Sequence, residues 1–264
     1  MLKIVDIHKT FNPNTINEKI ALDGVDLVLE DGEFVTVIGS NGAGKSTLLN
    51  AIAGTWFVDS GKIFIDDIDV TKLSEYKRAQ YIGRVFQDPM MGTAADMWIE
   101  ENLALAHRRG LKRGLKIGIT PDERETFKIL LKEFDLGLED RLSSKVGLLS
   151  GGQRQALTLI MATLQQPRLL LLDEHTAALD PKTASKVLEV TDKIVKKSGL
   201  TTFMVTHNMR DAIKYGDRLL MLNEGKIILD IKGEEKKNLT VDTLLQKFEK
   251  SSGNEFSEDS AILG

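Results

Sequence analysis

Short apolar runs alternate with amphipathic stretches along the chain, and this alternation predicts strands and helices in layers. The runs 34–38 and 169–172 are almost wholly apolar, which is typical of strands buried on both faces of a parallel sheet. A third strand is expected over 201–206, and the apolar spacing between the last two runs predicts an amphipathic helix over 182–197. Strands that alternate with helices in this way predict an α/β fold with a mainly parallel core sheet.

Near the N-terminus the pattern has the two-residue period of half-buried strands. Residues 2–7 and 25–29 alternate between apolar and polar side chains, and Asp31-Gly32 follows the second run. This dipeptide predicts a hairpin turn that leads directly into the strand 34–38. We therefore expect an antiparallel β subdomain at the start of the chain.

Between residues 88 and about 166 the apolar spacing becomes helical, which predicts an α-helical subdomain inserted into the sheet domain. Thr120 and Glu123 form a capping box that opens one of its helices. The expected domain covers 1–248, with a catalytic lobe over about 1–87 and 167–235 and a helical lobe over about 88–166. The polar residues 249–264 are expected to form a flexible tail.

Composition narrows the class of protein. The 264 residues carry a net charge of −4, which argues against a protein that binds nucleic acid through bulk positive charge. The chain has no cysteine, so disulfides and thiolate metal sites are excluded. No apolar run approaches the roughly 20 residues that span a bilayer, and the N-terminus does not have the pattern of a signal peptide. We expect a cytoplasmic protein that would serve a membrane only through a partner.

The strand 34–38 leads into a glycine-rich stretch that matches the phosphate-binding P-loop pattern. It consists of Gly39, Ser40, Asn41, Gly42, Ala43, Gly44, Lys45 and Ser46, with Thr47 next in the helix that follows. A strand, a glycine loop and a helix start direct backbone N–H groups and the positive helix end at a phosphate. Lys45 is expected to neutralise the β- and γ-phosphates, and the Ser46 hydroxyl to ligate Mg²⁺.

The second apolar strand ends in two carboxylates, Asp173 and Glu174. Downstream of a P-loop, this arrangement predicts that Asp173 lies near Mg²⁺, directly or through water. Glu174 is then placed to act as the general base that orients the attacking water.

A second glycine-containing helix start occurs at Leu149-Ser150-Gly151-Gly152-Gln153, and it predicts another backbone anion site. One ATP does not need two such sites from one chain. The stretch matches the signature motif of the ATP-binding cassette (ABC) family, which the sequence resembles over about residues 1–235. The other motifs of that family also occur in their usual order: Phe11 for the aromatic that stacks on adenine, Gln87 for the Q-loop, Asp180 for the D-loop and His207 for the switch histidine.

The resemblance implies a P-loop NTPase that binds ATP and Mg²⁺ and hydrolyses ATP as a head-to-tail dimer. Gln87 would sense the metal and water, and His207 would hold the γ-phosphate. Ser150, Gly151, Gly152 and Gln153 would bind the nucleotide held by the partner chain. Family members of this kind act at the inner face of the cell membrane, with a transmembrane permease and, in importers, an extracytoplasmic substrate-binding protein.

His175 departs from the family pattern, which usually has proline after the glutamate. It would add a titratable group near the γ-phosphate. The stretch 173–181 resembles importer ATPases for amino acids, either aromatic or branched-chain. The alternatives are an ABC exporter ATPase, a soluble ABC ATPase of cofactor assembly, and a small-molecule kinase, which the signature motif argues against.

Two further stretches have open interpretations. Met90, Met91, Met97 and Trp98 follow Gln87; they suit either a groove for a permease helix or packing within the helical lobe. A run of basic residues without an intervening acid indicates either a solvated loop or contact with anionic lipid. It comprises Arg108, Arg109, Lys112, Arg113 and Lys116.

Overall fold

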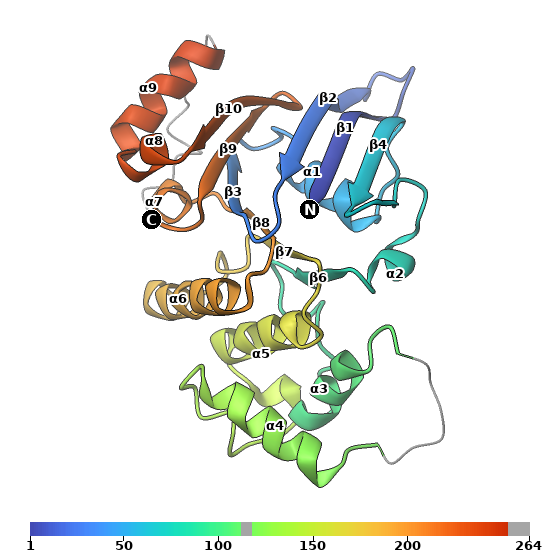
Figure 1. Ribbon diagram of the computed structural model, residues 1–264, viewed down its shortest axis with the longest axis vertical. Helices are drawn as coiled ribbons and strands as arrows, with labels where there is room; N and C mark the ends of the chain where they lie inside the picture. Colours follow the sequence, from blue (N-terminus) through green and yellow to red (C-terminus); the bar gives the residue numbers. More distant parts are fainter. Residues whose placement is uncertain (112–117, 253–264) are drawn as a thin grey trace.

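The computed structural model describes residues 1–111 and 118–252, which form two β-sheets with a group of helices at one end (Figure 1). The smaller sheet has the strand order β2-β1-β4-β5, and the larger one has the order β10-β9-β3-β8-β7-β6. The strands are β1 (Leu2–Phe11), β2 (Lys19–Leu29), β3 (Phe34–Gly39), β4 (Ser60–Ile65), β5 (Ile68–Asp69), β6 (Ile82–Val85), β7 (Leu169–Asp173), β8 (Thr202–Val205), β9 (Arg218–Asn223) and β10 (Lys226–Lys232).

The larger sheet is mainly parallel, which confirms the predicted α/β core. β3 lies between β8 and β9 and is parallel to both, β7 and β6 continue the parallel order, and the edge strand β10 is antiparallel to β9. Leu169 and Leu171 face one hydrophobic core while Leu170 and Leu172 face the other. Both faces of β7 are therefore buried, which explains why this strand contains no polar residue before its last position.

The smaller sheet confirms the antiparallel subdomain but not the turn that was expected to build it. β2 pairs with β1, which pairs on its other edge with β4, both antiparallel. β2 does not pair with β3, because both edges of β3 are occupied by β8 and β9. The hairpin predicted at Asp31-Gly32 is therefore wrong. Gly32, at φ 76°, instead turns the chain from one sheet to the other.

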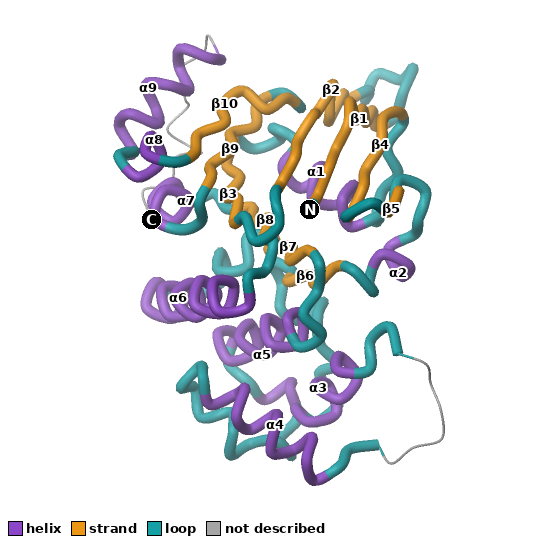
Figure 2. The backbone as a smooth tube through the Cα atoms, viewed as in Figure 1, coloured by secondary structure: helices purple, strands orange, loops and turns teal. Residues whose placement is uncertain are grey.

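Figure 2 shows α1 and the helices α3 to α6 on opposite sides of the larger sheet, while α7 and α9 pack against a third core that includes β9. α1 follows β3 and buries Leu48, Leu49 and Ile52 between the two sheets. On the other face, α3, α4, α5 and α6 share a second core with β7. Their bounds are α1 (Lys45–Ala53), α2 (Glu75–Arg78), α3 (Ile99–His107), α4 (Pro121–Lys132), α5 (Gly151–Thr163), α6 (Pro181–Ser198), α7 (Met209–Lys214), α8 (Glu234–Lys237) and α9 (Val241–Ser252).

Helix ends with side-chain caps lie where the sequence predicts them. The Thr120 hydroxyl accepts a hydrogen bond from Glu123 N (3.3 Å) at the start of α4, and Glu123 Oε2 accepts one from Thr120 N (2.7 Å). Gly54, at φ 84°, ends α1. Such caps satisfy backbone groups that a helix leaves unpaired.

The last part of the chain and the basic run both differ from expectation. α9 continues to Ser252 and so includes residues 249–252, which were expected to begin a flexible tail. Its amphipathic spacing, with Leu244 and Phe248 buried, keeps these residues helical. Arg108 pairs with Glu123 (2.9 Å) and Arg109 donates to the Ala162 carbonyl (3.1 Å), so these two arginines contact protein. Lys112, Arg113 and Lys116 of the same run, and residues 253–264, lie outside the described residues.

Over 1–111 and 118–252, no helix combines the length and apolar character needed to cross a membrane.

Candidate functional site

The P-loop connects the end of β3 to the start of α1, and its shape depends on glycine. Gly44 is the N-cap of α1 at φ 104°, and a Cβ there would lie 2.5 Å from the Ala21 carbonyl oxygen. No side chain caps this helix start. The first N–H groups of α1 therefore lack a side-chain acceptor, which is the arrangement that binds an anion at a helix N-terminus.

Lys45 lies inside this loop with its side chain mostly buried. Its Nζ donates to the carbonyls of Gly39 (2.7 Å) and Ser40 (3.0 Å). Burial lowers the pKa of the ammonium, while the nearby Glu174 carboxylate acts in the opposite direction. A partly desolvated cation of this kind interacts more strongly with an anion than a lysine in water.

A pocket of about 250 Å³ opens in front of the loop. The P-loop supplies one wall through residues 41–47, and Phe11, Lys19 and Ala21 of the smaller sheet supply another. The Phe11 ring is packed edge to face against Trp56, with the ring centroids 4.8 Å apart. An aromatic ring at one end and unpaired amides at the other suit a ligand with a planar base and phosphates.

Glu174 also lines this pocket and adds a carboxylate to it. It follows β7 and adopts φ 42°, a left-handed conformation that is uncommon for a non-glycine residue. His207 lies after β8, and its Nδ1 is 3.6 Å from Glu174 Oε2. The parallel order of β7 and β8 brings the two side chains together, because both follow the carboxyl end of their strand.

The charges of Glu174 and His207 stabilise one another. The contact with His207 lowers the pKa of Glu174, and the contact with Glu174 raises the pKa of His207. Glu174 is thus ionised at neutral pH, the state that a base must have to accept a proton from water.

Asp173 precedes Glu174 and contacts a residue that the sequence analysis missed. The guanidinium of Arg84, on β6, donates to Asp173 Oδ2 (3.3 Å) and to Asn50 Oδ1 (2.8 Å). Burial raises the pKa of Asp173, and the Arg84 charge opposes this shift. The sequence did contain a signal for this contact, namely an arginine in an otherwise apolar strand. A largely buried cation needs an anionic partner.

The oxygens of Ser46 and Asp173 form the hard donor set that Mg²⁺ prefers. Ser46 is in the pocket lining and is exposed, while the Asp173 side chain is 16% exposed. These two residues fit the expected ion. Gln87, the third residue predicted for the metal, is exposed and does not line the pocket; a hydrogen bond from Gln155 Nε2 to the Phe86 carbonyl (3.2 Å) ties the adjacent backbone to α5.

The signature residues do not line this pocket. The Ser150 hydroxyl is the N-cap of α5 and accepts from Gln153 N (3.3 Å), and Gln153 Oε1 accepts from Ser150 N (3.2 Å). α5 begins at Gly151, while Gly152 is packed so closely on α6 that a Cβ would lie 2.1 Å from Thr183 Cγ2. Asp180 caps α6 by accepting from Thr183 N (3.1 Å) and is exposed. Within one chain, these residues cap helices.

The interpretation of His175 as a group near the phosphate is wrong. Its side chain is 2% exposed, and Nε2 lies 3.4 Å from the Thr191 hydroxyl on α6. Because that hydroxyl donates to the Val187 carbonyl (2.7 Å), the imidazole is the donor to Thr191. Burial lowers the pKa of His175 to about 4, so it is neutral at pH 7 and belongs to the core.

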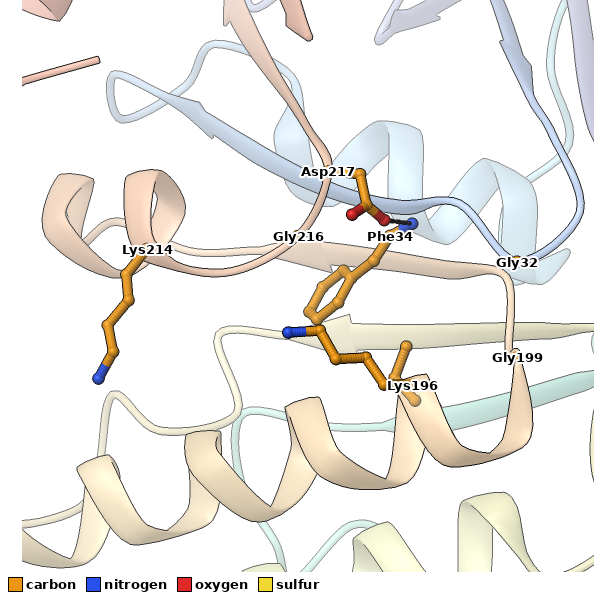
Figure 3. Close-up of a pocket in the computed structure, with 8 residues that line it drawn as sticks. Gly32, Phe34, Lys196, Gly199, Lys214, Gly216 and Asp217 are labelled. Carbon is orange, nitrogen blue, oxygen red and sulfur yellow. Dashed lines mark hydrogen bonds between the residues drawn. The ribbon is translucent and has the colours of Figure 1, made fainter. Parts of the chain in front are cut away.

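A second cavity of about 250 Å³ lies at the opposite end of β3 (Figure 3). Phe34 N donates to Asp217 Oδ2 there (3.1 Å), and Lys196 extends from α6 toward the Phe34 ring. Three glycines complete much of its lining. This cavity holds none of the predicted site residues.

Comparisons with known proteins find relatives over most of the chain. A family model described as ABC transporter matches residues 22–177. A tyrosine transport ATP-binding protein of Clostridioides difficile is 51% identical over 254 residues, covering 94% of this chain and 99% of that protein. An energy-coupling factor transporter ATP-binding protein, EcfA2 of Clostridium acetobutylicum, is 35% identical over 248 residues, covering 92% of this chain and 83% of that protein.

Solved structures are similar over most of their length. The dimeric post-hydrolysis state of the ATP-binding cassette MJ0796, bound to ADP and Pi, has a TM-score of 0.75 at 31% identity, covering 88% of this chain and 98% of that one. The ADP conformation of the cassette MJ1267 has a TM-score of 0.76 at 28% identity, covering 94% and 98%.

Proposed function

This chain belongs to the ABC transporter family and is an ATPase of that family, and we propose that it powers the import of an aromatic amino acid, with tyrosine as the first candidate. The observation that carries the substrate is the 51% identity to a tyrosine transport ATP-binding protein over nearly the full length of both chains. Of the two amino-acid classes that the sequence suggests, this relative favours the aromatic one.

The proposed chemistry assigns one task to each predicted site residue. Phe11 stacks on the adenine, the N–H groups of residues 39–47 hold the phosphates, and Lys45 offsets their charge. Ser46 and Asp173 hold Mg²⁺, which, when bound, stabilises charge on the phosphates. Glu174 accepts a proton from the attacking water, and His207 holds Glu174 and the γ-phosphate in position. Gln87 would contact the metal and water only in another conformation of the site, because its exposed side chain does not line the pocket here.

A second copy of the chain completes the site in this proposal. The pocket lining includes none of Ser150, Gly151, Gly152 and Gln153, and a two-fold axis would bring them onto the nucleotide of the other chain. Asp180 would lie at the same junction. The similarity to a dimeric cassette supports this arrangement.

The transport partner in this proposal is a separate transmembrane permease, with an extracytoplasmic substrate-binding protein on its other side and no nucleic acid. The chain would be cytoplasmic and peripheral at the inner face of the membrane. Its helical lobe, about 88–166, would contact the permease, and its catalytic lobe, about 1–87 and 167–235, would turn over ATP.

Two alternatives differ in what the ATPase drives. A cofactor-assembly ATPase would purify without a polytopic membrane protein, and an exporter would lower rather than raise cellular substrate. The relative at 35% identity is named an energy-coupling factor transporter ATP-binding protein, so it favours a membrane transporter over a soluble assembly factor.

Uptake of labelled tyrosine in a strain lacking this gene tests the proposal. Restoring the natural gene should restore uptake, and restoring the Glu174→Gln gene should not, because hydrolysis is lost while the protein remains. The uptake of labelled valine and of labelled phenylalanine is measured in parallel assays of the same strains. Unchanged tyrosine uptake in the deletion strain, or loss of valine uptake alone, would contradict an aromatic amino-acid importer.

A further inference from the structure

Arg84 lies between three elements of the ATPase site. It belongs to β6, three residues before Gln87, and its side chain is 13% exposed. Its guanidinium contacts Asp173 at the end of β7, Asn50 in the last turn of α1, Thr55 Oγ1 (3.1 Å) just beyond α1 and Glu75 Oε1 (3.5 Å) on α2. The same group lies over the Phe86 ring, with its carbon 4.5 Å from the ring centroid. One cation thus joins the P-loop helix, the acidic strand end and the start of the segment around Gln87.

The contact with Asp173 is one-sided. Arg84 Nη2 donates to Oδ2, and Oδ1 accepts no hydrogen bond from the residues that the structure describes. The carboxylate is therefore held by one oxygen and leaves the other for a further cation. Nη2 carries two N–H groups and donates to Asn50 Oδ1 as well, and the Asn50 contact is the shorter of the two (2.8 Å against 3.3 Å).

We propose that Arg84 is a positioning residue that orients Asp173 and offsets part of its charge, so that the carboxylate binds a divalent cation in one orientation and with reduced affinity. The inference rests on the proposed role of Asp173 in the metal site. Its physical basis is repulsion between a fixed guanidinium and a divalent ion that share one carboxylate. At the effective permittivity of a partly buried site, this repulsion is stronger than it would be in water.

The test separates metal affinity from nucleotide affinity. ADP dissociation constants are measured by calorimetry with EDTA and again with Mn²⁺. The ratio of the EDTA constant to the Mn²⁺ constant reports how far the metal tightens binding. Arg84→Gln should raise this ratio about fivefold, the upper scale of a partly exposed ion pair. ADP binding in EDTA should stay near the natural value.

Two variants serve as controls. Arg84→Lys keeps the charge and should keep the ratio. Arg168→Gln, which removes an exposed arginine paired with Asp66, is the matched control.

A purely structural Arg84 gives a different result. Arg84→Gln would then lower the melting temperature and weaken ADP binding in EDTA, with an unchanged ratio, and the proposal would be wrong. Should Arg84→Gln not fold, Asn50→Ala decides, because it removes the nearer acceptor of Nη2, lets the guanidinium approach Asp173 and should lower the ratio about twofold. An unchanged ratio in Asn50→Ala would overturn the inference.

Asp173→Asn distinguishes the two levels of the argument. It should bring the ratio close to that of ADP without metal. If Asp173→Asn leaves the ratio intact, the proposed role of Asp173 fails and the Arg84 inference fails with it. If Asp173→Asn lowers the ratio while Arg84→Gln has no effect on it, only the Arg84 inference fails.

Discussion

At the scale of single residues, Glu174 combines strain with charge. Its φ of 42° costs about 1–3 kcal/mol in a non-glycine residue. Strain of this kind persists only where the surroundings hold it, and here β7 and the His207 contact do so. The backbone turn presents the carboxylate to the pocket instead of the core, whereas His175, one residue later, is buried on the opposite side.

Replacing Glu174 by Gln should preserve ATP binding and slow hydrolysis by about 10²–10⁴-fold, the usual effect of losing a general base. Gln has nearly the same shape but cannot accept the proton. Phosphate release in a single turnover measures the rate, and gel filtration should show ATP-loaded dimers. Rapid turnover in this variant would move the base elsewhere, with His207 as the next candidate, since His175 is buried away from the pocket lining.

His175 should make the fold less stable in mild acid. Its pKa is about 4 in the folded chain against 6.5 unfolded, so the unfolded state binds more protons between these values. The free energy of unfolding should therefore fall as the pH drops from 6.5 toward 4, by up to about 3 kcal/mol. Urea titrations across this range measure it. His175→Phe should flatten the dependence, while His8→Gln, at a partly exposed histidine, should not; equal slopes in all three proteins would contradict this account.

The predicted site residues that the structure brings together share one property: their position depends on local backbone geometry. The P-loop glycines and the carboxylates after β7 can be recognised from their neighbours in the chain. Arg84 could not be assigned in this way, because its partners Asn50 and Asp173 come from α1 and β7 and meet only in the folded sheet. His175 was misplaced because the sequence gives no side on which a residue after a strand will point.

At the scale of elements, helices with caps were predictable and short helices were not. α4 and α6 have a polar N-cap followed by Pro121 or Pro181 at the first helical position, and both begin at that proline. α2, α7 and α8 have only four to six residues each, too few to establish a helical period. The turn at Asp31-Gly32 was misassigned because a turn dipeptide does not reveal which strand pairs with which.

α7 shows what holds such a short helix. The Asn208 side chain accepts from Asp211 N (3.1 Å) at its start. At its end, the Lys236 ammonium from α8 donates to the carbonyls of Tyr215 and Gly216 (2.7 Å to the latter). Lys236 is 4% exposed, and burial lowers its pKa to about 8. Because α7 follows His207 directly, the C-terminal segment supports the element next to the pocket.

Lys236→Met should therefore lower the free energy of unfolding by about 1–3 kcal/mol, because buried carbonyls at the end of α7 lose their donor. The neighbouring Lys237 is exposed and pairs with Glu234, so Lys237→Met should change stability by less than about 0.5 kcal/mol. Thermal and urea unfolding measure both. Equal effects of the two substitutions would show that the Lys236 contacts contribute little.

At the scale of the whole molecule, the structure separates the pocket from the signature helix and leaves an apolar surface after β6. Met90 is 44% exposed, Met91 70% and Trp98 44%. The interpretation of Met91 as part of an internal core is therefore wrong, while Met97 is half-buried. Large apolar side chains that are exposed where they gather on a surface are typical of an interaction site, and these three lie within nine residues of the chain.

Met90→Glu together with Met91→Glu should uncouple the subunit from its permease, because a charge in an apolar contact loses its hydration. The ATPase activity of the isolated chain should be unchanged, since neither residue lines the pocket. Copurification with the permease and tyrosine uptake are the measurements. Ile129→Glu, at an exposed apolar residue of α4, is the control. Normal assembly and uptake in the double variant would remove these methionines from the proposed interface.

The composite site can be tested with two inactive variants, Lys45→Ala and Ser150→Arg. Lys45→Ala removes the cation of the pocket, and Ser150→Arg blocks the exposed N-terminus of α5. In either homodimer every site carries one defect. In a mixed dimer related by a two-fold axis both defects fall in one site, and the other site is intact. Random pairing makes about half the dimers mixed.

The mixture should therefore occlude ATP in dimers that neither variant forms alone. To prevent turnover, Glu174→Gln is added to both variants, and filter binding of labelled ATP measures the occluded nucleotide. Far-ultraviolet circular dichroism of each variant confirms that loss of the α5 cap has not unfolded it. A mixture that occludes no more than its two components would mean that Ser150 serves its own chain, and the head-to-tail dimer proposed for this ATPase would be wrong.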